Sequence, residues 1–152
     1  MTAAKTTTAQ KRCSMLGLVL GMGASIVGCG PWIVGPTEQT DDGMVSFSGR
    51  IQPIFTTNCG GCHSPGGGAD LFGIRLQLTE DVSYDLLVDQ PSVQRSDLTL
   101  VLPGDSASSL LVAKVSSDPP PVGVRMPTFA PPLTKDEIDL IRAWIDQGAL
   151  DN

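Results

Sequence analysis

The stretch Asn58-Cys59-Gly60-Gly61-Cys62-His63 decides how the rest of the chain is interpreted. In it, two cysteines stand three positions apart, and the only histidine of the chain follows the second cysteine directly. Residues three apart lie on the same side of a helical turn, so the two thiols are expected to face one bound group together. The imidazole beside them is a further ligand for that group.

The pattern C-x-x-C-H is the attachment sequence of a c-type haem. The two thiols add across the two vinyl groups of one haem, and the histidine is the proximal ligand of the iron. Three fixed residues with frequencies of about 2% each coincide in roughly one chain per thousand of this length, so the motif is specific. We therefore expect one covalent haem c, attached through Cys59 and Cys62 and ligated by His63.

Two cysteines at this spacing also occur in three other kinds of site. A thioredoxin-like redox pair requires a βαβ setting, which the surrounding sequence does not offer. A zinc site requires two more cysteine or histidine ligands, but Cys13 and Cys29 lie in the N-terminal segment. A structural disulfide between Cys59 and Cys62 stays open, although it leaves His63 unexplained.

The second axial ligand of the iron has to come from a residue other than histidine. Outside the N-terminal segment the methionines are Met44 and Met126. Met126 stands in a proline-rich loop, and prolines hold such a loop in place with little entropy left to lose. Met44 stands in a polar segment where nothing is expected to position it. We therefore expect Met126 to be the distal ligand; the alternative is a methionine that fills a gap in the core.

The N-terminus has the pattern of an export signal. Residues 1–12 carry three basic residues and no acidic one, and residues 13–28 carry no charge. The apolar run is short for a span of roughly 20 helical residues. It ends in Ile26-Val27-Gly28-Cys29, which resembles a bacterial lipobox. We expect a signal peptide over residues 1–28 and an acylated Cys29 that anchors the exported chain to a membrane on its periplasmic side, the alternatives being a plain signal peptide or an uncleaved anchor helix.

The order of residues after the signal predicts a linker followed by one domain. Residues 29–45 mix glycine, proline, threonine and acids without periodicity, so they are expected to be a flexible linker. Residues 46–150 remain for a single folded domain. Gly30, rather than an aspartate, follows Cys29, which in Gram-negative lipoproteins favours the outer membrane.

The charge of the chain limits its partners. The formal charge is −6, and removing residues 1–28 removes three basic and no acidic residues, leaving −9. Binding of a nucleic acid through its phosphates is therefore not expected. Protein partners with positively charged patches are favoured.

Helical periodicity is clearest at the two ends of the predicted domain. Apolar residues in 46–58 recur at positions 47, 51, 54 and 55, and Pro53 fits only in a first turn or at a kink. In 134–149, Thr134 and Glu137 predict a capping box ahead of an apolar stripe that includes Trp144.

Two shorter helices are expected between them. One covers 80–89 with Thr79 as its cap, and the other covers 106–116 with Asp105 as its cap. Residues 74–78 alternate briefly, but no convincing series of strands is present. The pattern therefore predicts an all-α domain.

The order of these features resembles a class I c-type cytochrome, and more closely the Planctomycete-type cytochrome c domain. The matching stretches are Ile51-Gln52-Pro53-Ile54-Phe55, Gly73-Ile74-Arg75-Leu76, Pro103-Gly104-Asp105 with Ser109-Leu110, Arg125-Met126-Pro127, and residues 133–149. The resemblance implies an all-α, class I cytochrome c-like fold with one covalent haem, in which the first and last helices cross. It also implies thioether links at Cys59 and Cys62, with His63 as proximal and Met126 as distal ligand. The glycine-rich loop 66–68 after the motif departs from the pattern.

Two arginines are candidates for the haem propionates. Guanidinium–carboxylate contacts are strong and bidentate, which suits Arg75 and Arg125 to that role. Two solvated surface arginines are an equally good interpretation.

The expected activity is the transfer of single electrons between redox protein partners, without catalysis. Histidine–methionine ligation leaves no open iron position, and no group of acids, bases or nucleophiles appears in the sequence. One alternative is a haem-containing subunit or domain of a larger oxidoreductase or peroxidase. The other is a non-redox binding lipoprotein with a Cys59–Cys62 disulfide.

Overall fold

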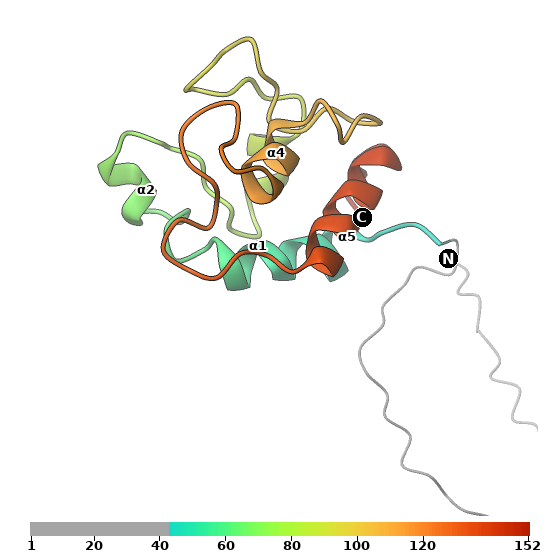
Figure 1. The fold of residues 1–152 in the computed structure, drawn as a ribbon. Coiled ribbons are helices and arrows are strands. Elements are labelled where there is room, and N and C mark those ends of the chain that lie inside the picture. Colours follow the sequence, from blue (N-terminus) through green and yellow to red (C-terminus); the bar gives the residue numbers. More distant parts are fainter. Residues whose placement is uncertain (1–42) are drawn as a thin grey trace, which may run out of the picture. The chain divides into compact units, whose positions relative to one another are not determined.

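The structure is a computed structural model that describes residues 43–152. The predicted signal peptide, Cys29 and most of the predicted linker lie outside the described residues. In chain order the elements are η1 (Phe47–Ile51), α1 (Gln52–Asn58), α2 (Gly68–Leu71), α3 (Ser83–Leu87), α4 (Leu110–Ser116) and α5 (Lys135–Asp146) (Figure 1). No strand forms within residues 43–152, where pairing is limited to isolated bridges between Val88 and Val101 and between Pro91 and Thr99. In this part of the chain no helix is long and apolar enough to cross a bilayer.

The helix predicted over 46–58 is present as two consecutive pieces. The π-helical turn η1 begins after Ser46, whose hydroxyl accepts from the backbone N–H of Gly49 at 3.0 Å. α1 follows without a break and has Pro53 in its first turn. Proline has no N–H to donate to the preceding helical turn, and the chain changes from π-helix to α-helix at this point.

The last helix is formed as its sequence predicts. The Thr134 hydroxyl accepts from the Glu137 N–H at 3.2 Å, and the Glu137 carboxylate accepts from the Thr134 N–H at 2.7 Å. These two bonds complete the predicted capping box at the start of α5. The helix ends before Gly148, which has a φ of +104° that a glycine adopts readily.

The helix predicted over 80–89 is shorter than expected, and Thr79 is not its cap. α3 begins only at Ser83, and the preceding N-cap residue, Val82, makes no side-chain bond. The Thr79 carbonyl instead accepts from the Ser83 N–H at 2.9 Å, which closes a separate turn. At the other end, the Asp89 N–H donates to the Val101 carbonyl at 2.9 Å, so a distant segment draws the chain out of the helix.

The helix predicted over 106–116 also begins late, because its predicted cap is used elsewhere. Asp105 accepts from the Ser108 N–H at 2.9 Å and so closes a turn of its own. Ser109 then accepts from the Leu102 N–H at 2.9 Å, and α4 starts only at Leu110. The side chain expected to cap the helix therefore stabilises the turn before it.

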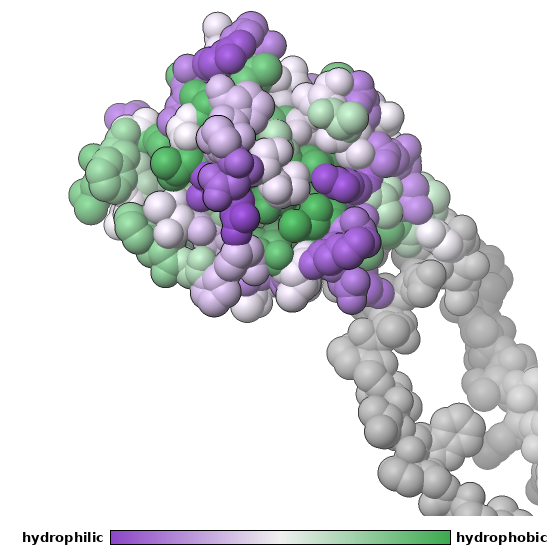
Figure 2. Space-filling view, in the orientation of Figure 1, coloured by the Kyte–Doolittle hydropathy of each residue, from purple (hydrophilic) through white to green (hydrophobic). Residues whose placement is uncertain are grey.

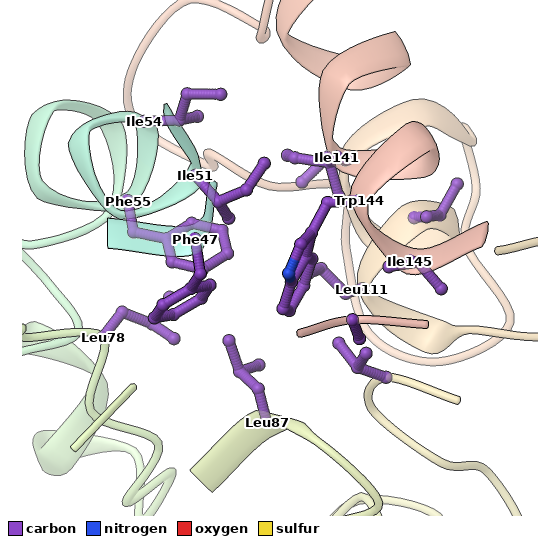
Figure 3. Packing of buried hydrophobic residues seen from close by; sticks show 14 of the residues in the cluster. Phe47, Ile51, Ile54, Phe55, Leu78, Leu87, Leu111, Ile141, Trp144 and Ile145 are labelled. Atoms are coloured by element: carbon purple, nitrogen blue, oxygen red, sulfur yellow. The ribbon is translucent and has the colours of Figure 1, made fainter. Parts of the chain in front are cut away.

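The core lies between the first and last helices, whose side chains pack on each other. The rings of Phe47 and Trp144 have their centroids 5.1 Å apart, and Figure 3 shows the side chains of η1 and α1 directed towards those of α5. Trp144 is fully buried, and its indole N–H donates to the Leu150 carbonyl at 2.9 Å. Ile51, Phe55, Leu87, Val101, Ile141 and Ile145 are buried in the same cluster.

Both ends of the described chain are bound to these helices. The Val45 N–H donates to the Gln147 side-chain carbonyl at 2.7 Å, so the last residues of the predicted linker contact the end of α5. Asn152 accepts from the Phe47 N–H through its side chain at 2.8 Å and from the Ser48 N–H through its carbonyl at 2.9 Å. These bonds satisfy N–H groups at the start of η1, which have no partner within the helix.

Candidate functional site

The five residues of the C-x-x-C-H motif form a tight turn at the end of α1. The Cys59 N–H donates to the Phe55 carbonyl at 2.8 Å, and the His63 N–H donates to the Cys59 carbonyl at 2.9 Å. The structure thus brings the three predicted residues together on one turn. At Gly60 an added Cβ would lie 2.9 Å from the Thr56 carbonyl oxygen, so a side chain at this position would clash with backbone.

The imidazole of His63 is oriented by a segment that the sequence did not single out. Its Nδ1 lies 2.9 Å from the Leu76 carbonyl oxygen. A carbonyl can only accept, so Nδ1 carries the proton and Nε2 holds the lone pair that can bind a metal. The Leu78 N–H donates to the His63 carbonyl at 2.7 Å. Residues 74–78, which alternate in polarity but form no strand, therefore hold His63 from both its backbone and its ring; we call them the histidine strap.

The histidine strap is in turn bound to the first helix by a buried glutamine. Gln52 is only 3% exposed, and its amide donates to the Leu78 carbonyl at 3.0 Å. Its carbonyl oxygen accepts from the Ser83 hydroxyl at 2.5 Å. Its two partners lie 26 and 31 residues away, so the sequence around Gln52 does not reveal them.

The two cysteines are free thiols in different surroundings. Cys62 is exposed, whereas Cys59 is half-buried. Burial, together with the nearby Cys62 and Glu137, raises the pKa of the Cys59 thiol to about 11. Glu137 lies close because the Asn58 amide donates to its carboxylate at 3.2 Å. A redox-active dithiol has a lowered thiol pKa, so this environment does not favour a thioredoxin-like pair.

Met126 lies in the loop between α4 and α5 and is tied to α4. Its N–H donates to the Lys114 carbonyl at 2.7 Å, and its sulfur accepts from the Thr128 hydroxyl at 3.2 Å. Lys114 also donates from Nζ to the carbonyls of Val122 at 3.0 Å and Val124 at 2.6 Å. Partial burial lowers the pKa of Lys114. Sequence analysis did not single out this lysine, because its three contacts depend on how the loop folds back.

One candidate arginine lies in the strap that holds His63, and the other stands beside Met126 in the chain. Arg75 is exposed and belongs to the histidine strap, one residue before Leu76. Arg125 is half-buried and directly precedes Met126. Within residues 43–152 the ion pairs are Arg95–Asp97 and Lys135–Asp139, so neither candidate arginine is paired with a carboxylate there.

Large apolar side chains are exposed after the motif and in the Met126 loop. On and directly after α2, Leu71 is 84% and Phe72 is 78% exposed, and Phe129 in the Met126 loop is 88% exposed. Figure 2 shows apolar surface over the region of α2. Exposed side chains of this size indicate a surface that contacts another group.

No family model, no curated protein and no solved structure matches this chain. Within the described part of the chain, no three or more His, Cys, Asp or Glu side chains are grouped so that they could hold a metal ion. The Cys59–His63 turn offers two thiols and an imidazole, and the thioether of Met126 lies on a separate loop, bound to Lys114 and Thr128. Thiols for attachment, and imidazole and thioether for the iron, are the donors that a c-type haem uses.

Proposed function

We propose that this protein is a monohaem c-type cytochrome that transfers single electrons between redox protein partners and is not itself an enzyme. The observation that carries the proposal is the turn from Cys59 to His63, in which the Leu76 carbonyl lies 2.9 Å from His63 Nδ1. That bond fixes the ring tautomer in which Nε2 is available to iron. A structural disulfide would not require an oriented imidazole.

Each residue of the site would then have a defined part. Cys59 and Cys62 would hold the porphyrin covalently, and His63 and Met126 would ligate the iron on its two sides. The bound haem supplies a one-electron couple, whose potential methionine ligation raises. Arg75 and Arg125 are placed by the chain next to the ligand-bearing segments, where they would neutralise propionates. The exposed side chains of Leu71, Phe72 and Phe129 offer apolar surface for the porphyrin edge.

The proposal extends to where the protein works. An acylated Cys29 would hold the exported domain on the periplasmic side of a membrane, and the outer membrane is favoured by Gly30. Anchoring by more than one acyl chain is stable. The formal charge of −9 after residue 28 favours redox partners with positively charged surfaces.

The experiment that tests the proposal measures the covalent attachment itself. The full chain is expressed in a bacterium that has haem-attachment machinery, and the intact mass of the mature protein is compared with that of Cys59→Ser/Cys62→Ser. The acyl groups on Cys29 are common to both proteins, so we expect the wild-type mass to exceed that of the double variant by one haem plus the two sulfur-for-oxygen replacements. Only wild type should stain for haem on a denaturing gel. A difference equal to the two replacements less two hydrogens would instead show a Cys59–Cys62 disulfide and contradict the proposal.

A further inference from the structure

The Met126 loop is tied to α4 at three points, and all three belong to Lys114. Its Nζ donates to the carbonyls of Val122 at 3.0 Å and Val124 at 2.6 Å. Its own carbonyl accepts from the Met126 N–H at 2.7 Å. Lys114 therefore binds the loop at Met126 itself and at Val124, two positions earlier.

The surroundings of Lys114 show that these contacts are specific. Its ammonium group pairs with no carboxylate in residues 43–152, where the other lysine, Lys135, pairs with Asp139. A partly buried cation loses hydration, and here the two carbonyl oxygens replace it. Bonds from a charged donor are stronger than those between neutral groups.

The loop has a shape that admits this lysine. Gly123 stands between the two carbonyl-bearing residues and has a φ of +65°. A Cβ at this position would lie 3.1 Å from Lys114 Nζ, so a side chain would press on the ammonium group. The positive φ favours glycine, and the Lys114 ammonium group would have to shift by a few tenths of an ångström to admit a Cβ.

α4 is a firm support for the loop. Leu111, Val112 and Val115 are buried in the main core, so the backbone of Lys114 is fixed by the packing of its neighbours. The Met126 loop, which is bound to α4, is therefore held in a fixed position relative to the core.

We propose that Lys114 is a positioning residue that sets the place of Met126 and thereby the strength with which its thioether binds the iron. The inference rests on the proposed function, since it concerns the distal ligand of that haem. It goes beyond it by assigning the control of this ligand to a residue on another element.

The test uses the haem-loaded full chain as wild type, Lys114→Met, Lys114→Arg and Gly123→Ala, with Lys135→Met as the matched control. Lys135→Met removes the same charge from an exposed site on α5. Three quantities are measured: the near-infrared charge-transfer band of the iron–methionine bond, the affinity for added imidazole, and the midpoint of urea unfolding.

We expect Lys114→Met to weaken the band and to bind imidazole about tenfold more tightly, because a displaced methionine competes less well with an added ligand. Gly123→Ala disturbs the same contact from the loop and should also weaken the band and tighten imidazole binding. Lys114→Arg keeps the positive charge and should show smaller changes in the band and in imidazole affinity. Lys135→Met should leave both unchanged. A lower unfolding midpoint with an unchanged band and imidazole affinity would assign Lys114 a structural role and overturn the inference.

The outcomes separate this inference from the proposed function. If wild type carries haem and shows the band, and Lys114→Met and Gly123→Ala match it in imidazole affinity, the inference is wrong while the cytochrome proposal stands. If Lys114→Met does not fold, the band and the imidazole affinity of Gly123→Ala decide whether the inference stands. If wild type carries no haem, both fall together.

Discussion

The Gln52 side-chain amide donates to the Leu78 carbonyl at 3.0 Å and so joins the first helix to the strap that holds His63. The Leu78 N–H in turn donates to the His63 carbonyl at 2.7 Å. Gln52 and His63 are 11 positions apart in the chain, and two hydrogen bonds through Leu78 connect them. The position of His63 depends on this connection as much as on the motif itself.

Replacing Gln52 with leucine should therefore destabilise the fold. Gln52→Leu leaves the Leu78 carbonyl without its donor and the buried Ser83 hydroxyl without its acceptor. We expect a loss of about 2–3 kcal/mol in the free energy of unfolding, the cost of unpaired buried polar groups. Urea unfolding measures it. Gln90→Leu, at an exposed position, is the control and should stay within about 0.5 kcal/mol of wild type. Equal losses in the two variants would contradict a role for the Gln52 bonds.

The capping box at α5 should make stability depend on pH. Hydrogen bonds from the backbone N–H and the hydroxyl of Thr134 lower the pKa of Glu137. The unfolded chain therefore binds a proton at higher pH than the folded one, and the stabilisation is present above the pKa of a free carboxyl group and lost as the pH falls through the lowered value. We expect the stability advantage of wild type over Glu137→Gln to shrink between about pH 5 and pH 3.

Two further variants test the same cap. Thr134→Ala should cost about 1 kcal/mol at neutral pH, because the Glu137 N–H loses its acceptor. Asp136→Asn removes a carboxylate from the same turn and should show a smaller change with pH. If Glu137→Gln followed the wild-type pH profile in thermal unfolding, the carboxylate would not carry the cap.

Sequence reasoning succeeded where the signal is local. The capping box of α5 and the turn of the C-x-x-C-H motif follow from residues a few positions apart, whereas the packing of the first helix on the last was expected only from the family resemblance. Helices were correctly predicted within 80–89 and 106–116, but their starts and caps were wrong. Asp105 closes a local turn with Ser108, and the Val101 carbonyl binds the Asp89 N–H from a distant segment, which no local pattern reveals.

The supports of the candidate site were missed for the same reason. The strap over residues 74–78 has no regular structure, and its importance lies in backbone carbonyls that every residue has. Gln52 and Lys114 look like ordinary helical residues until their distant partners are placed. The motif predicts which atoms bind the haem, whereas the fold determines what holds those atoms.

Met126→Ala should change the redox properties of the haem-loaded protein. We expect the near-infrared iron–methionine band to disappear and the reduction potential to fall by on the order of 0.1–0.2 V, because axial ligands set haem potentials over a range of about 0.8 V. Spectroelectrochemical titration measures both. Met44→Ala is the control, because Met44 lines a small cavity with Val45, Arg50 and Leu140 beside the first and last helices. Loss of the band in Met44→Ala and its retention in Met126→Ala would reverse the assignment of the distal ligand.

The unequal thiols of the haem-free protein should react at different rates. Cys62 is exposed, whereas burial raises the pKa of Cys59 to about 11, so at pH 8 Cys59 forms little of the thiolate that attacks iodoacetamide. We expect Cys62 to be alkylated at least about tenfold faster than Cys59 at this pH. Peptide mass mapping of briefly labelled folded protein measures the ratio, and labelling in urea, where the two rates should converge, is the control. Equal rates in the folded protein would show that Cys59 is not shielded as the structure indicates.

Cys29→Ser should detach the protein from the membrane, provided that the signal is still cut. The apolar run ends at Cys29, which the lipobox resemblance makes the acylated residue, and in residues 43–152 no helix is suited to cross a bilayer. Removing the acylated thiol removes the anchor, so haem-stained protein should move from the membrane pellet to the soluble extract after cell fractionation. Cys13→Ser is the matched control, because it removes a thiol from the same N-terminal segment and leaves Ile26-Val27-Gly28-Cys29 intact. If Cys29→Ser stayed in the pellet with the control, the uncleaved N-terminal helix rather than a lipid would hold the domain at the membrane.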